Sequence, residues 1–324
     1  MRTIAPKAMA KRVHVAVGVV MDNQGRILIA KRPDHVHQGG LWEFPGGKVE
    51  QGETLIQALD RELFEELDIR VDGALPLIDI IHDYPDKQVH LAVCRVVSWH
   101  GMPVGKEGQP TRWVEPHELD QYPFPAANYP ILNALQLPER CLITGEFATP
   151  ADLTRRLRAA LSTGLRMVLL RAHDVSVGEY VCLAQEAIQH TKAKGVKLLL
   201  AHPHILDVVR EVNADGVHLS SSQLMSLGAD VKTNIPDDWM IGASCHSPAE
   251  LRQAELIRAS YVFLSPVKAT ASHPGKPPMG WVKFAELARR AQVPVYALGG
   301  LADCDVAQAI EHGGQGIAAI RAWW

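Results

Sequence analysis

The sequence lacks any apolar run that approaches the ~18–20 residues of a transmembrane helix, so no membrane association is expected. It also lacks an excess of basic residues. The 33 Lys and Arg stand against 36 Asp and Glu, which leaves a formal net charge of −3. Stable nucleic-acid binding is therefore not expected, because such binding depends on cations that neutralise phosphates.

Paired cysteines are absent as well. The five cysteines are scattered and no two form a Cys-x-x-Cys motif, which predicts isolated thiols in a reducing compartment. The basic start, MRTIAPKAMAKR, is not followed by the apolar segment of about 7–15 residues that a secretory signal carries. We therefore expect a cytoplasmic protein. The sequence does not indicate its oligomeric state.

A chain of 324 residues predicts two domains, at roughly 100–200 residues each. Its apolar fraction of 47% and charged fraction of 21% are ordinary for globular proteins and exclude a disordered chain. The pattern of apolar residues changes at Leu-Pro-Glu-Arg, residues 137–140. We therefore predict domains over residues 1–137 and 138–324.

The first domain has the pattern of strands around one helix. Residues 13–21 and 27–32 are apolar and flank a turn at 22–25, which predicts a hairpin. Residues 54–68 have helical periodicity, with a leucine at every fourth position from Leu55 and a capping box at Thr54. Further strands are predicted over 75–83, 87–97 and 111–115, and a short helix over 126–136.

The second domain alternates strands and helices, which predicts a TIM-type (β/α) barrel. The sequence ends four residues after the last predicted strand, so the last outer helix is expected to be missing. Trp323 and Trp324 are expected to cover that flank instead. The predicted strands are 141–144, 166–171, 197–201, 216–219, 240–244, 261–264, 293–298 and 316–320.

The predicted helix of the first domain carries three glutamates on one edge. Glu62, Glu65 and Glu66 are three or four residues apart, and like charges at this spacing repel by a few tenths of a kcal/mol per pair. Such repulsion is tolerated on a solvated helix face, or where a cation binds. Oxygen ligands select Mg²⁺, or Mn²⁺, rather than zinc.

Two features before and within the helix favour the cation. Gly46 and Gly47 let the backbone approach a metal or phosphate closely. Arg61 can pair with Glu53 and hold the preceding loop against the helix. One stretch of the sequence therefore contains a glycine loop, a glutamate at a fixed spacing from that loop and an Arg-Glu-x-x-Glu-Glu motif.

This stretch resembles the Nudix box. The resemblance implies a Nudix α-β-α sandwich, within an α/β and α+β chain, and hydrolysis of a nucleoside diphosphate linked to another group. Asp68 departs from the pattern, because the family has a glycine there that ends the helix in the left-handed conformation. Aspartate tolerates that conformation, so we expect a modest stability cost and an intact site. The matching residues are Gly47, Glu53, Arg61, Glu62, Leu63, Glu65, Glu66 and Ile69.

The resemblance also implies roles for individual residues. Divalent cations would bridge carboxylates and phosphate oxygens and activate water. Glu62 is expected to be the general base and Lys48 to steady the phosphates, with Glu107 as a further catalytic carboxylate. The division of roles among Glu62, Glu65 and Glu107 stays open. The expected metal ligands are the Gly46 carbonyl, Glu65, Glu66 and Glu107.

The resemblance to MutT-type Nudix hydrolases, the 8-oxo-dGTP diphosphatases, extends from about residue 13 to residue 137. It is carried by segments 16–20, 41–48, 105–110 and 124–128. It implies conversion of 8-oxo-dGTP, an oxidised purine nucleoside triphosphate, to 8-oxo-dGMP and pyrophosphate, which keeps oxidised guanine out of DNA. The expected substrate-binding residues are Arg32, His37, Glu43, Phe44, Pro45, Gly46 and Asn128.

Asn128 is the residue expected to read the base. Oxidised guanine offers an O6 acceptor and an N7–H donor, and an amide side chain has both a donor and an acceptor. A buried polar site of this kind rejects the wrong base by leaving groups unpaired. The alternative is that Asn128 is a turn residue before Tyr129-Pro130.

The second domain resembles the thiamin phosphate synthase/TenI family. Segments 214–219, 241–247 and 265–270, with Gly299-Gly300-Leu301, carry the resemblance. An anion pocket is expected at strand ends, although the glycines could equally form tight turns. The residues of this possible anion site are Arg171, Ser244, Thr270, Gly299 and Gly300.

Several departures argue against synthase chemistry. Residues 201–204, Ala-His-Pro-His, replace an Asn-Asp-Arg motif, and Gln223 replaces a metal-binding aspartate. His273 stands at the position of a phosphate-binding lysine, and Pro266 at the position of the tautomerases' histidine. Pyrophosphate activation by Mg²⁺ is therefore not expected. His202 and His204 suggest a metal site, but no third ligand is near in sequence.

Two other functions remain open. The Nudix site could act on a thiamin-pathway pyrophosphate that the barrel supplies or senses, which the fusion itself suggests. The barrel could also be a binding or packing module without activity.

Overall fold

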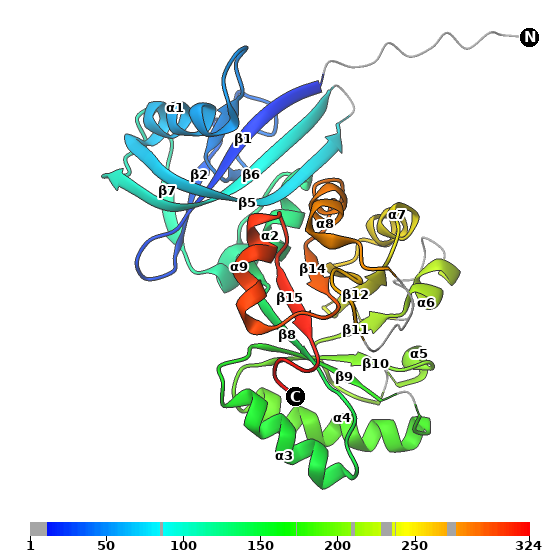
Figure 1. Ribbon diagram of the computed structural model, residues 1–324. Coiled ribbons are helices and arrows are strands. Elements are labelled where there is room, and N and C mark those ends of the chain that lie inside the picture. Colours follow the sequence, from blue (N-terminus) through cyan, green and yellow to red (C-terminus); the bar gives the residue numbers. More distant parts are fainter. Residues whose placement is uncertain are drawn as a thin grey trace, which may run out of the picture. The chain divides into compact units, whose positions relative to one another are not determined.

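The computed structural model describes residues 12–84, 87–172, 174–208, 211–227, 235–236, 238–270 and 277–324. The chain divides into two compact units, of which the first ends at Leu132 and the second begins at Asn133. The boundary predicted after Leu137 lies a few residues further along. Each unit has its own β-structure and its own buried core (Figure 1).

The first unit is built on two β-sheets. Its strands are β1 (Arg12–Val20), β2 (Ile27–Lys31), β3 (Trp42–Glu43), β4 (Gly46–Lys48), β5 (Ile69–Asp83), β6 (Gln88–Gly101) and β7 (Thr111–Val114). The larger sheet has the order β4-β1-β6-β5, with β1 parallel to β6 and antiparallel to β4. The smaller sheet has the order β3-β2-β7 and is antiparallel.

The predicted hairpin of residues 13–21 and 27–32 is wrong. The turn between them forms, since the Asp22 carboxylate accepts two backbone hydrogen bonds across it (2.9 Å each). Beyond one bridge at the turn, however, the two strands diverge into different sheets. Both edges of β1 pair with β4 and β6, and both edges of β2 pair with β3 and β7, so neither strand has an edge left for the other.

The predicted helix is α1 (Leu55–Leu67). The capping box is confirmed, since Thr54 Oγ1 accepts a hydrogen bond from Gln57 N–H (3.3 Å) and the Gln57 side chain accepts one from Thr54 N–H (2.9 Å). The helix lies on one face of the larger sheet, where a Cβ added to Gly18 of β1 would be 3.1 Å from Leu59. Its buried residues are Ala58, Leu59, Leu63 and Leu67.

Short helical segments follow β7, and the last of them continues past Leu132 into the residues of the second unit. These are η1 (Pro116–Gln121), η2 (Ala126–Asn128) and α2 (Tyr129–Gln136). The helix predicted over 126–136 therefore begins as a 3₁₀ turn and continues as an α-helix. The α+β fold class expected for this unit is confirmed.

The second unit is a closed barrel of eight parallel strands, as predicted. The strands are β8 (Arg140–Ile143), β9 (Met167–Arg171), β10 (Lys197–Ala201), β11 (Gly216–Leu219), β12 (Met240–Cys245), β13 (Tyr261–Leu264), β14 (Val295–Leu298) and β15 (Gly316–Ala319). They pair in this order, and β15 closes on β8. Tyr261, Phe263 and Tyr296 fill the interior with ring centroids 5.3–5.8 Å apart, so the barrel is a packed core and not a pore.

Helices follow the first seven barrel strands. They are α3 (Pro150–Leu161), α4 (Val177–Lys192), α5 (Ile205–Val208), α6 (Ser221–Ser226), α7 (Pro248–Leu256), α8 (Gly280–Ala288), η4 (Asp303–Asp305) and α9 (Val306–Glu311). Among the described residues, no helix combines the length and the apolar character that a membrane span requires.

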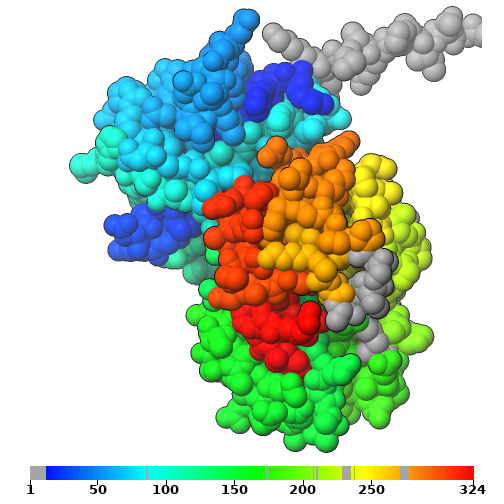
Figure 2. Space-filling view, in the orientation of Figure 1, coloured from blue at the N-terminus to red at the C-terminus, as the bar shows by residue number. Residues whose placement is uncertain are grey.

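Residues 320–324, which follow β15, form a turn rather than a helix. Trp323 and Trp324 pack against the barrel core, and Trp324 Nε1 donates to the carbonyl oxygen of Glu146 (3.0 Å). In Figure 2 these residues (red) lie against the first segment of the barrel (green). The tryptophans therefore cover the flank, as predicted.

Asp68 ends α1 in the predicted left-handed conformation, with φ 60° and ψ 32°. Its backbone N–H donates to the carbonyl oxygens of Leu63 and Phe64. Its carboxylate pairs with Lys106 (3.1 Å), but both side chains are well exposed, so this ion pair contributes little stability.

The substitution Asp68→Gly should raise the melting temperature of the first unit, and Asp68→Ala should lower it. A left-handed conformation costs roughly 1–2 kcal/mol for a residue with a Cβ, less for aspartate, and nothing comparable for glycine. Differential scanning calorimetry checks the order Gly, Asp, Ala. Equal melting temperatures for all three proteins would contradict it.

Candidate active site

The two glycines of β4 leave room for neighbouring atoms of β1 and α1 that a side chain at either position would displace. Gly46 has φ 143°, and an added Cβ would lie 2.1 Å from the carbonyl oxygen of Ala16 in β1. At Gly47, an added Cβ would lie 2.2 Å from the Glu62 carboxylate. The glycines therefore let β4 pair with β1 while the Glu62 carboxylate packs against the backbone of β4.

Arg61 fastens the loop before α1 to the helix. Its Nε and Nη2 donate to the two carboxylate oxygens of Glu53 (2.7 and 3.0 Å), and this pairing lowers the pKa of Glu53 to about 2. Arg61 also donates to Glu62 (2.9 Å), to Glu65 (3.2 Å) and to the carbonyl oxygen of Lys48 (3.0 Å). The predicted pairing of Arg61 with Glu53 is confirmed.

Glu66 is a partly buried carboxylate near the end of the helix. Its Oε2 accepts a hydrogen bond from Gly46 N–H (3.2 Å). Burial, followed by the neighbouring carboxylates of Glu43, Glu62 and Glu107, raises the pKa of Glu66 to about 8. The negative charge around Glu66 is therefore incompletely balanced by the protein itself.

A divalent cation fits this surplus of carboxylate oxygens, because Mg²⁺ and Mn²⁺ prefer oxygen ligands. Among the described residues, no three carboxylate, imidazole or thiolate groups already surround a single point. The side chains of Glu65 and Glu107 are exposed, so both are able to turn toward Glu66. The ligands expected from the sequence, Gly46, Glu65, Glu66 and Glu107, therefore stay a prediction.

A pocket adjoins these carboxylates. Gly46 and Gly47 line it and also contact Glu66 and Glu62, respectively. Its floor is the face of the larger sheet opposite α1, because side chains alternate between the two faces of a strand. The floor residues are Val13, Val15, Val17, Val89 and Leu91.

The pocket brings together most of the predicted substrate-binding residues. Pro45 is the exception, since it is buried, is not among the lining residues, and uses its carbonyl oxygen to accept from Gly18 N–H (2.8 Å). Lys48, predicted to steady the phosphates, also lines the pocket. The predicted substrate-binding residues that line it are Arg32, His37, Glu43, Phe44, Gly46 and Asn128.

Arg32 is held on the pocket wall by two contacts. Its Nε donates to the carbonyl oxygen of His37 (3.0 Å), and its Nη1 donates to the Glu43 carboxylate. Burial raises the pKa of Glu43, and Arg32 opposes that shift. The guanidinium is therefore oriented before any ligand binds.

Asn128 also lines the pocket and is only 8% exposed. Its backbone N–H donates to Pro125 (2.9 Å), while its side-chain amide makes no hydrogen bond to another described residue. Phe44 stacks on Phe124 with ring centroids 5.3 Å apart and gives the pocket an aromatic wall. An amide with free hydrogen-bonding capacity beside such a wall is suited to binding a planar base.

Besides the apolar lining, sequence reasoning missed three polar side chains of the pocket. Tyr84 and Lys87 belong to the turn between β5 and β6, and Gln38 has a left-handed backbone (φ 60°). The Tyr84 ring contacts those of His37 (5.0 Å) and His82 (4.5 Å). The two strands that flank this turn were predicted, but its place at the pocket depends on the pairing of β1 with β6, which has no local sequence signal.

In the barrel, the residues of the predicted anion site belong to the carboxyl ends of four strands and the loops that follow them. Gly299 and Gly300 form a crowded turn, because a Cβ on Gly300 would lie 2.3 Å from the carbonyl oxygen of Ala269. Ser244 Oγ is 2.9 Å from Nε2 of the fully buried His218, and burial lowers the pKa of His218 to about 3. The close backbone contact at Gly300 thus supports the interpretation of these glycines as a tight turn. Anion binding at this site stays a prediction.

The metal site suggested by His202 and His204 is not supported. His202 is buried, its Nε2 lies 3.1 Å from the carbonyl oxygen of Val175, and its Nδ1 accepts from His204 N–H (3.1 Å). Both ring nitrogens are therefore used within the fold. His273 lies outside the described residues.

Gln223, at the position of the family's aspartate, has a structural role. Its Nε2 donates to the carbonyl oxygens of His202 and Pro203 (3.0 Å each), and its Oε1 accepts from Ser220 N–H (2.8 Å). The two segments that depart from the synthase motifs are thus joined to each other by neutral hydrogen bonds.

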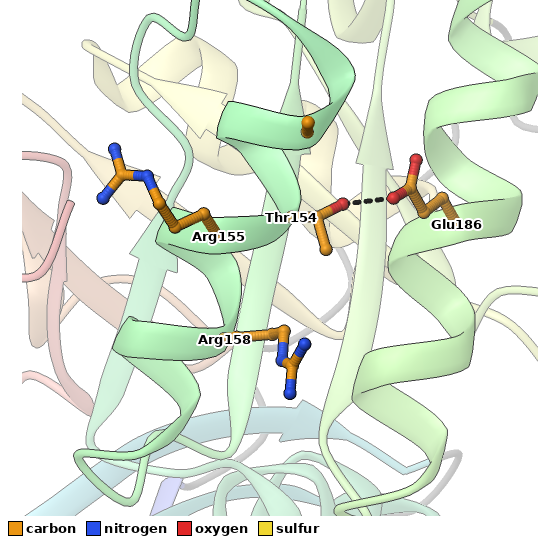
Figure 3. A pocket seen from close by; sticks show the side chains of 5 residues that line it. Thr154, Arg155, Arg158 and Glu186 are labelled. Atoms are coloured by element: carbon orange, nitrogen blue, oxygen red, sulfur yellow. Dashed lines mark hydrogen bonds between the residues drawn. The ribbon is translucent and has the colours of Figure 1, made fainter.

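A further hollow lies on the surface of the barrel between α3 and α4 (Figure 3). Thr154 donates to Glu186 across it, and Arg155 pairs with Asp152. These polar groups are used in joining and capping the two helices, so the hollow does not form a candidate site.

The first unit is similar in sequence to a known family of hydrolases. A model of the NUDIX domain matches residues 16–134. The chain is 37% identical over 126 residues to the 8-oxo-dGTP diphosphatase of Escherichia coli (strain K12), covering 39% of this chain and 98% of that protein. It is 39% identical over 118 residues to the CTP pyrophosphohydrolase of the same organism, covering 36% of this chain and 87% of that protein.

The second unit matches a different family. A model of thiamine monophosphate synthase matches residues 140–323. The chain is 30% identical over 209 residues to the thiamine-phosphate synthase of Roseiflexus sp. (strain RS-1), covering 63% of this chain and 82% of that protein.

The raised pKa of Glu66 predicts a pH-dependent stability in EDTA. Between its ordinary value of 4.5 and about 8, the carboxyl group loses its proton in the unfolded chain but keeps it in the fold, so stability falls as the pH rises through this window. Glu66→Gln does not titrate and should remove this component. Melting of the first unit at pH 5 to 8.5 checks this, and parallel curves for the two proteins would contradict it.

Proposed function

Because the chain belongs to the Nudix family through residues 16–134 and to the thiamine monophosphate synthase family through residues 140–323, we propose a specific activity for its first unit. This unit is a Mg²⁺-dependent pyrophosphohydrolase that converts 8-oxo-dGTP to 8-oxo-dGMP and pyrophosphate. Its role is to remove the oxidised nucleotide from the pool used for DNA synthesis.

The observation that carries the choice of substrate is the side-chain amide of Asn128, which lines the pocket and is not bonded to another described residue. Guanine presents an acceptor at N7, whereas 8-oxoguanine presents an N7–H donor beside the O6 acceptor. One amide matches the oxidised edge with both of its groups. The unoxidised base leaves the amide partly unpaired, which a buried site penalises strongly.

The cation would be held by Glu65, Glu66, Glu107 and the Gly46 carbonyl, and when bound it neutralises phosphate charge and lowers the pKa of water. The surplus negative charge around Glu66 supports this assignment. Mn²⁺ is expected to substitute for Mg²⁺, because it prefers the same oxygen ligands.

We assign the role of general base to Glu62, and its contact with Arg61 supports this assignment. Arg61 donates to its Oε1 (2.9 Å), which fixes one carboxylate oxygen and leaves the other for the proton of water. Lys48, exposed on the pocket rim, places an ammonium group where it attracts the phosphates.

The barrel is proposed to have lost synthase activity. Pyrophosphate activation needs anionic oxygens around Mg²⁺. The segment at His202 and the side chain of Gln223 instead bond to each other through neutral groups. The barrel then serves as a binding or packing module.

Pyrophosphate release tests the substrate assignment. We expect wild type with Mg²⁺ to prefer 8-oxo-dGTP over dGTP and CTP, and Asn128→Ala to lower the 8-oxo-dGTP to dGTP ratio of kcat/KM at least tenfold, because the edge-reading amide is lost. Glu62→Gln should lower kcat by about 10²–10⁴-fold without changing that ratio.

Three outcomes would contradict the assignment. A preference for CTP would show that the first unit acts on cytidine nucleotides instead. Turnover of hydroxymethylpyrimidine pyrophosphate, with 8-oxo-dGTP inert, would assign the first unit to a thiamin-pathway pyrophosphate. An unchanged 8-oxo-dGTP to dGTP ratio of kcat/KM in Asn128→Ala would show that Asn128 does not recognise the base.

A separate assay tests the barrel. With hydroxymethylpyrimidine pyrophosphate, the thiazole phosphate and Mg²⁺, we expect no thiamin phosphate above a blank without enzyme, as measured by conversion to a fluorescent thiochrome. An active thiamin phosphate synthase is the positive control. Product formation above the blank would show that the barrel retains catalysis despite Gln223.

A further inference from the structure

The loop that carries Glu107 is tightly closed. Gly108 N–H donates to the carbonyl oxygen of Gly105 (3.1 Å), and Gly108 has φ 77°. An added Cβ on Gly105 would lie 2.2 Å from the carbonyl oxygen of Gln109 and 3.2 Å from its Oε1. The side chain of Gln109 therefore folds back over the loop to which it belongs.

This loop covers the end of α1. The last carbonyl oxygens of a helix have no partner within it. Lys106 N–H donates to the carbonyl oxygen of Glu66 (2.9 Å), and Val104 N–H donates to that of Leu67 (2.9 Å). The loop thus supplies the hydrogen bonds that the final turn of α1 lacks, beside the partly buried Glu66 carboxylate.

The Gln109 amide joins the backbones of two expected metal ligands. Its Nε2 donates to the carbonyl oxygen of Glu66 (3.0 Å), and its Oε1 accepts from the backbone N–H of Glu107 (2.9 Å). One side chain therefore connects Glu66 to Glu107 through two hydrogen bonds in series. Gln109 is partly buried, whereas Glu107 is exposed.

Besides these backbone hydrogen bonds, the loop has one other side-chain link to α1 among the described residues, and it lies on the surface. Lys106 Nζ bonds Asp68 (3.1 Å) and the carbonyl oxygen of Phe64 (3.3 Å). Exposed ion pairs of this kind fix geometry weakly. The Gln109 bridge is the more sheltered link, and it ends on Glu107 itself.

We propose that Gln109 is a positioning residue, which holds Glu107 where its carboxylate and that of Glu66 bind the same divalent cation. The proposal rests on the cation site of the proposed function. It assigns Gln109 no contact with substrate or metal. Its effect on the cation is exerted through the backbone of Glu107.

The physical reason is the cost of ordering an exposed loop. Without the bridge, the backbone of Glu107 is held only through its neighbours Lys106 and Gly108, and binding the cation must restrict it further. Partners that orient metal ligands typically affect metal affinity by about 10–100-fold. Because the Glu107 N–H is exposed and can bond to water, losing the bridge should change folding stability little.

The test measures Mn²⁺ binding by electron paramagnetic resonance on the full chain without nucleotide. Gln109→Met removes both hydrogen bonds at similar side-chain size. Gln24→Met, in the exposed turn before β2, is the matched control. Glu107→Gln and the double variant Glu107→Gln/Gln109→Met complete a thermodynamic cycle.

We expect Gln109→Met to weaken Mn²⁺ binding about tenfold or more, with a melting temperature in EDTA close to wild type. Glu107→Gln should weaken binding similarly, and adding Gln109→Met to it should have little further effect. Gln24→Met should bind as wild type. If Gln109→Met does not fold, Gln109→Glu, which keeps the acceptor for Glu107 N–H and loses the donor to Glu66, takes its place in the cycle.

Three results would overturn the proposal: unchanged Mn²⁺ binding in the Gln109 variant, unchanged binding in Glu107→Gln, or full additivity in the double variant. Full additivity would show that Gln109 acts on the fold in general. Failure of the substrate assignment is separate, because Mn²⁺ binding is measured without nucleotide. A chain whose Mn²⁺ binding depends on Glu107 and on the Gln109 bridge, but which does not hydrolyse 8-oxo-dGTP, would refute only the substrate assignment.

Discussion

The mutual repulsion of carboxylates around Glu66 is the constraint on which the first unit depends. Burial and the charges of Glu43, Glu62 and Glu107 oppose ionisation of Glu66. Arg61 offsets part of this charge through Glu53 and Glu62, but the remainder persists. Such a cluster is an unfavourable interaction within the fold, and a divalent cation bound there would offset it.

The barrel contrasts with this cluster of carboxylates. Gln223 and the segment at His202 are neutral and satisfy each other's hydrogen-bonding groups, so no surplus charge is left for a cation. The interior is filled by Tyr261, Phe263 and Tyr296. The first unit thus has carboxylates whose charge is not balanced within the fold. In the barrel, the polar groups at Gln223 and His202 are already hydrogen-bonded to each other.

The features that could be predicted from the sequence are those with local causes. The capping box at Thr54 and the left-handed Asp68 depend on a few neighbouring residues, and the eight barrel strands follow from alternating apolar segments. The wrong hairpin and the missed Tyr84 have a common cause. Both depend on the pairing of β1 with β4 and β6, and the short, glycine-rich β4 has little strand character of its own. The Gln109 bridge likewise joins residues 43 positions apart.

The most direct test of the central claim is the effect of Mg²⁺ on thermal stability at pH 8. If the carboxylates around Glu66 form a cation site, Mg²⁺ raises the melting temperature of the first unit in wild type, because a ligand that binds only the folded state stabilises it. The same addition leaves the first unit of Glu66→Gln and the transition of the barrel nearly unmoved. An equal shift in wild type and Glu66→Gln, or none in either, would contradict the account.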